Sequence, residues 1–238
     1  LTKSNIDRFV EAHGATKSFG LDCYRRLVQM FGSTVKGIDP AKFNEIYEAA
    51  KTYYGDFTEE TYEILVSIFE EIYEAEVGEA FPEDPNVQLL EAANAVYKSW
   101  FSDKAVSYRE IEGLDEKMGT AVTVQEMIFG NLEGSATGVA FTHNPNTGEK
   151  GIYGDYLKGA QGEDVVSGAH KVHPIAKMFE DEDLVKPARE LQAIMSKLFT
   201  DERDILDIEF TIERGKLYML QYRVAKRSQR ASVRSLID

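Results

Sequence analysis

The stretch Asp207-Ile-Glu-Phe-Thr-Ile-Glu-Arg-Gly-Lys-Leu-Tyr-Met-Leu-Gln-Tyr-Arg223 decides how the second half of the chain folds. Ile208, Phe210 and Ile212 alternate with polar residues, and an Arg-Gly pair separates this run from a second apolar-rich run. Alternation with a period of two is typical of a half-buried strand, and a glycine-containing break between two such runs indicates a turn. The stretch therefore predicts a β-hairpin.

One face of the predicted hairpin carries polar side chains. Asp207 and Glu209 lie two residues apart and point the same way, as do Gln221 and Arg223 on the second strand. A two-residue turn would offset Glu209 from Gln221 by one residue and leave the two polar pairs on opposite faces. Three loop residues or a bulge in the Ile212–Leu217 turn would bring Glu209 opposite Gln221 and Asp207 opposite Arg223. We therefore expect an odd connection at this turn.

These polar groups suit a magnesium-bound polyphosphate. Mg²⁺ prefers oxygen ligands and keeps phosphate oxygens among them, so Glu209 and Gln221 are candidate ligands. Arg223 can neutralise phosphate through two parallel hydrogen bonds. A cross-strand salt bridge on a solvated face explains the same spacing, and the spacing alone leaves both interpretations open.

A glycine-rich loop from Gly130 to Gly138 is a second candidate. We expect it between two strands, one marked by Val122 and Val124 and the next by Val139. Glycines let backbone N–H groups turn inward to form an anion site, and Thr137 can add a hydroxyl donor. A plain flexible hairpin loop explains these residues as well.

Two further stretches carry polar side chains. Gln161–Asp164 precedes an apolar pair, where the start of a helix or strand and contact with a metal or ribose are equally open interpretations. His170 and His173 lie three residues apart without a nearby carboxylate or thiol, so no metal site is expected there.

Helical periodicity marks the first hundred residues and one later segment. Apolar stripes predict helices through Tyr24–Phe31, after the cap and first-turn pair Asp39–Pro40, through Tyr62–Tyr73, behind the pair Asp84–Pro85, and through Leu184–Leu198. We expect these stripes, including Leu89, Ala93, Val96 and Trp100, to form core. Helices followed by strands with one embedded helix indicate an α+β architecture.

Composition excludes several classes of partner. The chain has 238 residues and a net charge of -14, which argues against broad affinity for nucleic acid or anionic membranes. No apolar run approaches the roughly 20 residues of a membrane helix. The single cysteine, Cys23, permits no internal disulfide and favours a reducing, cytoplasmic location, although the start at Leu1 leaves room for a removed targeting segment.

Four blocks follow one another along the chain: Thr120–Asn131, Thr137–Gly148, Ala160–Val166 and Asp207–Gln221. In this order they resemble the nucleotide-binding region of the pyruvate, phosphate dikinase family. Tyr24–Phe31 and Lys98–Trp100 resemble that family's helical insert, which favours the dikinase over its relative phosphoenolpyruvate synthase.

The resemblance implies a partial ATP-grasp fold with an N-terminal all-helical insert. The implied parts are a helical subdomain at 1–83, a remnant of the first ATP-grasp subdomain at 84–124, the C-terminal ATP-grasp subdomain at 125–228 and the start of a linker at 229–238.

The resemblance also implies roles for individual residues. Glu209 and Gln221 would hold Mg²⁺ on the ATP phosphates, and the catalytic pair would be Asp207 and Arg223, with Arg223 on the phosphates. Nucleotide-binding residues would be Gln125, Glu126, Met127 and Ile128 as a hinge strand against adenine, Thr137 and Gly138 in a phosphate-covering loop, and Asp164 near the nucleotide. This favours the metal site over the plain salt bridge.

Two segments depart from the family pattern. His143 stands where the family usually has Arg, and Ala169–Pro174 replaces a segment that usually carries Arg-Thr-Pro. Both changes lower the local positive charge.

The family uses ATP and phosphate to phosphorylate a histidine and then pyruvate, giving phosphoenolpyruvate, AMP and pyrophosphate. The resemblance implies that an opening subdomain would precede Leu1 and that a phosphohistidine domain and a pyruvate-binding barrel would follow Asp238. These domains are the expected partners, the complete enzyme is expected to be a homodimer, and this chain alone is expected to be inactive. A stand-alone nucleotide-sensing or protein-interaction module is the alternative.

Overall fold

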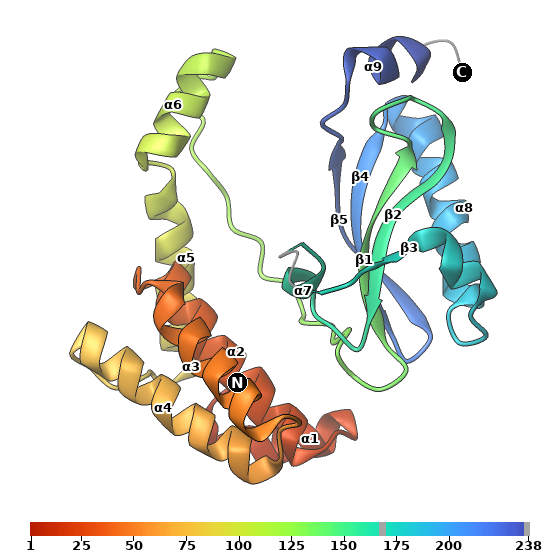
Figure 1. Cartoon of the computed structure of the whole chain (residues 1–238). Helices are drawn as coiled ribbons and strands as arrows, with labels where there is room; N and C mark the ends of the chain where they lie inside the picture. Colours follow the sequence, from red (N-terminus) through yellow and green to blue (C-terminus); the bar gives the residue numbers. More distant parts are fainter. Residues whose placement is uncertain (167–169, 236–238) are drawn as a thin grey trace. The chain divides into compact units, whose positions relative to one another are not determined.

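The computed structural model describes residues 1–166 and 170–235. The chain divides into two compact units, Leu1–Gln125 and Glu126–Asp238 (Figure 1). Among the described residues, no helix combines the length and the apolar character needed to cross a membrane.

The described part of the first unit is helical. Its elements are η1 (Lys3–Asn5), α1 (Ile6–His13), α2 (Lys17–Thr34), α3 (Pro40–Tyr54), α4 (Glu59–Val77), α5 (Pro85–Ser99) and α6 (Asp103–Glu112). The side chain of Asp39 accepts a hydrogen bond from the Ala41 amide at 2.9 Å, and Asp84 accepts one from the Asn86 amide at 2.8 Å. The helices predicted from the cap and first-turn pairs are confirmed, because these signals are local.

The core of this unit lies among α1 to α4 and the segment that follows them. Tyr24, Phe43, Phe69 and Tyr73 are its largest fully buried side chains. Helix α5 joins this core through the partly buried Ala92.

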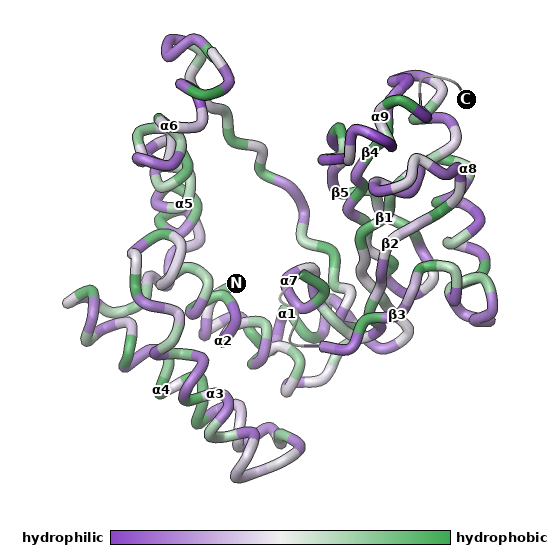
Figure 2. The backbone as a smooth tube through the Cα atoms, turned by 45° about the horizontal axis from the view of Figure 1, so that its top comes forward, coloured by the Kyte–Doolittle hydropathy of each residue, from purple (hydrophilic) through white to green (hydrophobic). Residues whose placement is uncertain are grey.

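The apolar stripe on α5 does not form core as expected. Leu89 and Val96 are 45% and 40% exposed, and neither belongs to the core cluster of this unit. In Figure 2 both α5 and α8 alternate between hydrophilic and hydrophobic colours, as amphipathic helices do. Periodicity predicts such a face correctly but does not show what covers it.

The second unit is built on an antiparallel sheet with the strand order β3-β2-β1-β4-β5. The strands are β1 (Ala136–His143), β2 (Lys150–Lys158), β3 (His173–Pro174), β4 (Leu206–Glu213) and β5 (Lys216–Val224). The helices are α7 (Gly162–Val166), η2 (Ile175–Glu180), α8 (Val185–Glu202) and α9 (Gln229–Ser235). Helices together with an antiparallel sheet confirm the α+β class.

Helix α8 covers one face of this sheet, and α7 lies on the other side (Figure 1). Leu191 of α8 is fully buried in one cluster with Ile208, Phe210 and Ile212 of β4. The apolar face of β4 therefore points toward α8, and its polar face points away from that helix.

The strands of the second unit differ in part from those expected. Residues 119–129 form no strand, so the strand predicted at Val122 and Val124 is absent, while β2 was not predicted. The segment expected as the start of a linker, 229–238, begins with α9, whose Ala231 is buried against Ile205 and Ala225, and its role as a linker stays a prediction. Residues 236–238 of that linker lie outside the described residues.

Candidate nucleotide and metal site

The β4–β5 hairpin has a tight turn and a bulge further along its second strand. Glu213 pairs with Lys216, so the turn contains two residues, Arg214 and Gly215, both at positive φ (49° and 79°). Positive φ at both positions is the requirement of the turn that fits the twist of paired strands. The expectation of three residues or a bulge at the turn is therefore wrong.

The odd offset arises in β5 instead. Phe210 pairs with Met219, and Glu209 pairs with Gln221, so Leu220 is the extra residue of a β-bulge. Beyond the bulge, Asp207 pairs with Arg223. The predicted convergence of these two polar pairs is confirmed, although the bulge lies elsewhere.

Packing on the α8 side accounts for the place of the bulge. Met219 packs against the core, and the Tyr222 hydroxyl donates to Glu202 Oε1 on α8 at 3.0 Å. Residues three apart on a regular strand would point to opposite faces, and the extra Leu220 lets both point toward α8. The same insertion places Gln221 beside Glu209 on the polar face.

Asp207 and Arg223 form an ion pair on this face. Arg223 Nε and Nη2 lie 2.9 Å and 2.8 Å from Asp207 Oδ2. The Asp207 carboxylate, and then the charge of Glu209, raise the pKa of Arg223, so the guanidinium stays charged. Its side chain is 61% exposed, which leaves it open to an incoming anion. The cross-strand salt bridge considered from the sequence is thus present in this half of the site.

The other half offers two oxygen donors for a cation. A carboxylate from Glu209 and an amide oxygen from Gln221 lie on directly paired residues. The described residues contain no cluster of three or more His, Cys, Asp or Glu side chains that could hold a metal by themselves. Few protein ligands, all of them oxygen, fit Mg²⁺ that takes its remaining ligands from phosphate and water.

Thr137 and Gly138 lie in strand β1, so their expected placement in a loop is wrong. The Thr137 hydroxyl is buried and donates to the Phe210 carbonyl at 3.2 Å. A Cβ added at Gly138 would lie 2.7 Å from Phe210 Cζ and 2.7 Å from the Asp155 carbonyl oxygen. Glycine is needed here because the sheet and core approach the backbone too closely for a side chain.

The expected hinge strand at Gln125–Ile128 has no regular secondary structure. Gln125 ends the first unit, and Glu126, Met127 and Ile128 begin the second. The Phe129 amide directly after them donates to Glu213 Oε2 at 2.8 Å. Glu213 was not among the site residues predicted from the sequence. The signal that could have identified it is the alternating pattern of β4, which places Glu213 on the same face as Glu209.

Asp164 lies in α7, whose formation confirms the helix start considered for Gln161–Asp164. Its Oδ2 accepts a hydrogen bond from the Gln161 amide at 2.9 Å, as a carboxylate at a helix start does. The role of Asp164 near the nucleotide stays a prediction.

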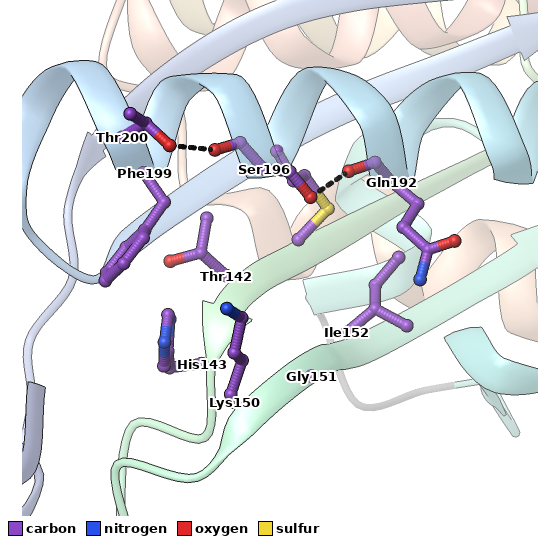
Figure 3. A pocket seen from close by; sticks show the side chains of 10 residues that line it. Thr142, His143, Lys150, Gly151, Ile152, Gln192, Ser196, Phe199 and Thr200 are labelled. Carbon is purple, nitrogen blue, oxygen red and sulfur yellow. Dashed lines mark hydrogen bonds between the residues drawn. The ribbon is translucent and has the colours of Figure 1, made fainter. Parts of the chain in front are cut away.

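His143 lies on the α8 side of the sheet, away from the polar face. Its ring is 1% exposed and its centroid is 4.2 Å from that of Phe199. It lines a pocket of about 260 Å³ between α8 and the paired strands β1 and β2, together with Lys150 and Gln192 (Figure 3). None of the predicted site residues lines this pocket. In Ala169–Pro174, the other segment that departs from the family pattern, Ala169 lies outside the described residues.

Comparison with known proteins finds matches to one kind of enzyme. A family profile described as "Pyruvate phosphate dikinase, AMP/ATP-binding domain" matches residues 83–187. The chain is 42% identical to pyruvate, phosphate dikinase of Rhizobium meliloti (strain 1021), with 92% of this chain aligned. It is 44% identical to that of Clostridium symbiosum, with 98% of this chain aligned. The chain is homologous to the ATP-binding part of pyruvate, phosphate dikinases. A Giardia intestinalis dikinase is 44% identical over 92% of the chain.

The chain spans about a quarter of the length of these dikinases, 26%, 27% and 26% respectively. The family profile includes Glu126–Ile128, Thr137 and Asp164 but ends before β4. The hairpin with Glu209 and Gln221 is thus described by its own geometry, not by the profile.

Proposed function

We propose that the chain forms part of the Mg-ATP site of a dikinase with an ATP-grasp fold. Glu209 and Gln221 hold Mg²⁺, and Arg223 binds the phosphates. The observation that carries the proposal is the bulge at Leu220, which pairs Glu209 with Gln221 and Asp207 with Arg223 on one face.

Each side chain has a distinct task in this proposal. When bound, Mg²⁺ neutralises charge on the phosphate oxygens. Asp207 holds Arg223 through Nε and Nη2, which reduces the side-chain entropy lost when phosphate binds. Nη1 is directed to the phosphates in this proposal.

The base and the remaining contacts come from earlier segments. We assign adenine contact to Gln125–Ile128, and Asp164 to the vicinity of the nucleotide. For Thr137 and Gly138 we retain the proposed proximity to phosphate, although their direct contacts are within the sheet. The proposed parts remain a helical insert at 1–83, a first-subdomain portion at 84–124, the C-terminal ATP-grasp subdomain at 125–228 and a linker from 229.

For the whole enzyme, we propose the reaction that converts ATP, phosphate and pyruvate into AMP, pyrophosphate and phosphoenolpyruvate through a phosphorylated histidine. A phosphohistidine domain and a pyruvate-binding barrel are the proposed partners within a homodimer. Turnover by this chain alone is not expected, and cytoplasmic location remains a prediction, since some relatives are named chloroplastic. No observation favours the stand-alone module over the enzyme.

Calorimetric titration with ATP, with and without Mg²⁺, tests the site on this chain. Glu209→Gln should weaken Mg-ATP binding by about tenfold or more, because charge-assisted contacts contribute about 1.5–3 kcal/mol. The matched control is Glu190→Gln, an exposed residue of α8. Equal affinity and equal Mg²⁺ dependence for the parent and both variants would refute the assignment.

A further inference from the structure

The polar face of β4 continues beyond the proposed metal residues. Asp207, Glu209, Thr211 and Glu213 alternate with the buried apolar residues of the strand, so all four lie on the face away from α8. Glu213 is four residues from Glu209, a distance of roughly 13 Å along the strand. This distance is of the order of an extended nucleoside triphosphate.

Glu213 holds the backbone that follows the proposed base-contact residues. Its Oε2 accepts the Phe129 amide at 2.8 Å, and the Phe129 side chain is buried. The Arg214 amide next to Glu213 donates to Ser135 Oγ at 3.0 Å. Both ends of the segment 129–135 are therefore attached to the β4–β5 turn.

The segment is also packed closely against its surroundings. A Cβ added at Gly130 would lie 2.5 Å from the Ala160 carbonyl oxygen and 3.0 Å from Thr137 Cβ. The Ala160 amide donates to the Gly130 carbonyl at 3.0 Å. Thr137 pairs with Thr211, so the segment passes over the polar face between Glu209 and the turn. Phe129 and Gly130 thus have little freedom to shift.

We propose that Glu213 is a positioning residue that sets Glu126–Ile128 at a fixed spacing from the cation at Glu209. Strand β4 then carries both ends of the nucleotide site, with the phosphates and cation near Glu209 and the base beside the segment that Glu213 anchors. This inference rests on the proposed function. It adds that recognition of the base depends on Glu213, whereas recognition of the phosphates does not.

Two probes separate the two ends of the site. Mg-ATP reports on both ends, and magnesium with inorganic triphosphate reports on the cation end alone. In NMR titrations of this chain reaching millimolar ligand, Glu213→Ala should weaken Mg-ATP binding by about tenfold, the loss of one charge-assisted hydrogen bond. The affinity of Glu213→Ala for magnesium with triphosphate should stay within about twofold of the parent's affinity. A general loss of folding would instead lower the affinity for both probes.

Two further variants complete the experiment. Glu213→Gln should recover most of the ATP affinity, because an amide oxygen can accept the same hydrogen bond from Phe129. Glu190→Ala on α8 is the matched control and should bind both probes like the parent. Hydrogen exchange at the Phe129 amide should be about tenfold or more faster in Glu213→Ala and near the parent rate in Glu213→Gln.

The outcomes distinguish this inference from the proposed function. Unchanged ATP affinity in Glu213→Ala, or equal losses for ATP and triphosphate, would overturn the positioning role. If Glu209→Gln leaves the binding of both probes unchanged, or the parent binds neither, the proposed function fails and this inference fails with it. Loss of ATP affinity alone, with recovery in Glu213→Gln, would support it.

Discussion

Replacing Gly138 with alanine distinguishes a packing role from a ligand role. The added Cβ would lie 2.7 Å from Phe210 Cζ and 2.7 Å from the Asp155 carbonyl oxygen, about 1 Å inside normal contact distance. Phe210 is fully buried, and Asp155 belongs to the ladder of β1 and β2, so neither can retreat easily. We expect Gly138→Ala to lower the free energy of unfolding of the second unit by about 3 kcal/mol, the upper part of the range for overpacking.

Urea denaturation, monitored through hydrogen exchange of the amides in β1 and β4, measures this effect in the second unit. The matched control is Gly162→Ala, because an added Cβ there meets nothing within 4 Å and should leave stability nearly unchanged. Under conditions where Gly138→Ala is folded, its Mg-ATP affinity should equal that of the parent. A variant as stable as the parent that no longer binds Mg-ATP would refute the packing argument and support direct contact of Gly138 with phosphate.

Two other changes test neighbouring parts of the second unit. His143→Ala should lower unfolding free energy by about 2 kcal/mol or more through lost packing on Phe199, without changing Mg-ATP affinity; a denaturation midpoint equal to the parent's would contradict this. The Lys158 ammonium lowers the pKa of Asp181 below the ordinary value near 3.9, so this pair stabilises the fold above about pH 4 and the effect is lost as pH falls through the lowered pKa. Because the pair is partly exposed, we expect it to contribute less than about 1 kcal/mol to the fall in unfolding free energy on acidification, and Asp181→Asn should abolish this contribution. If the variant loses stability between pH 5 and 3 as steeply as the parent, the assignment is wrong.

Local signals in the sequence predicted the helices well. Asp39 with Pro40 and Asp84 with Pro85 mark helix starts through hydrogen bonds within one turn, so no distant residue is needed to interpret them. Strands depend on partners. Val122 and Val124 alternate like a strand but lie in a segment without a ladder, whereas β2, which the alternation did not reveal, is held by its neighbours.

Part of the candidate site could be predicted from the sequence. The two polar pairs can share one face only if there is an odd offset between Glu209 and Gln221, and the structure contains that offset. The position of that offset follows from Met219 and Tyr222 packing toward α8, which a hairpin sequence alone does not contain. The sequence shows only that His143 stands where the family usually has Arg, and the tertiary fold shows that it is buried on the α8 side of the sheet.

Paramagnetic broadening by Mn²⁺ in place of Mg²⁺ tests the metal site most directly. With ATP present, substoichiometric Mn²⁺ should broaden the side-chain amide signal of Gln221 and the backbone amide of Glu209 before other signals of the chain. Gln192 on α8, beyond the opposite face of the sheet, is the internal control and should stay sharp. Broadening of Gln192 with Gln221 unaffected would contradict the proposal that Glu209 and Gln221 hold the nucleotide-bound cation.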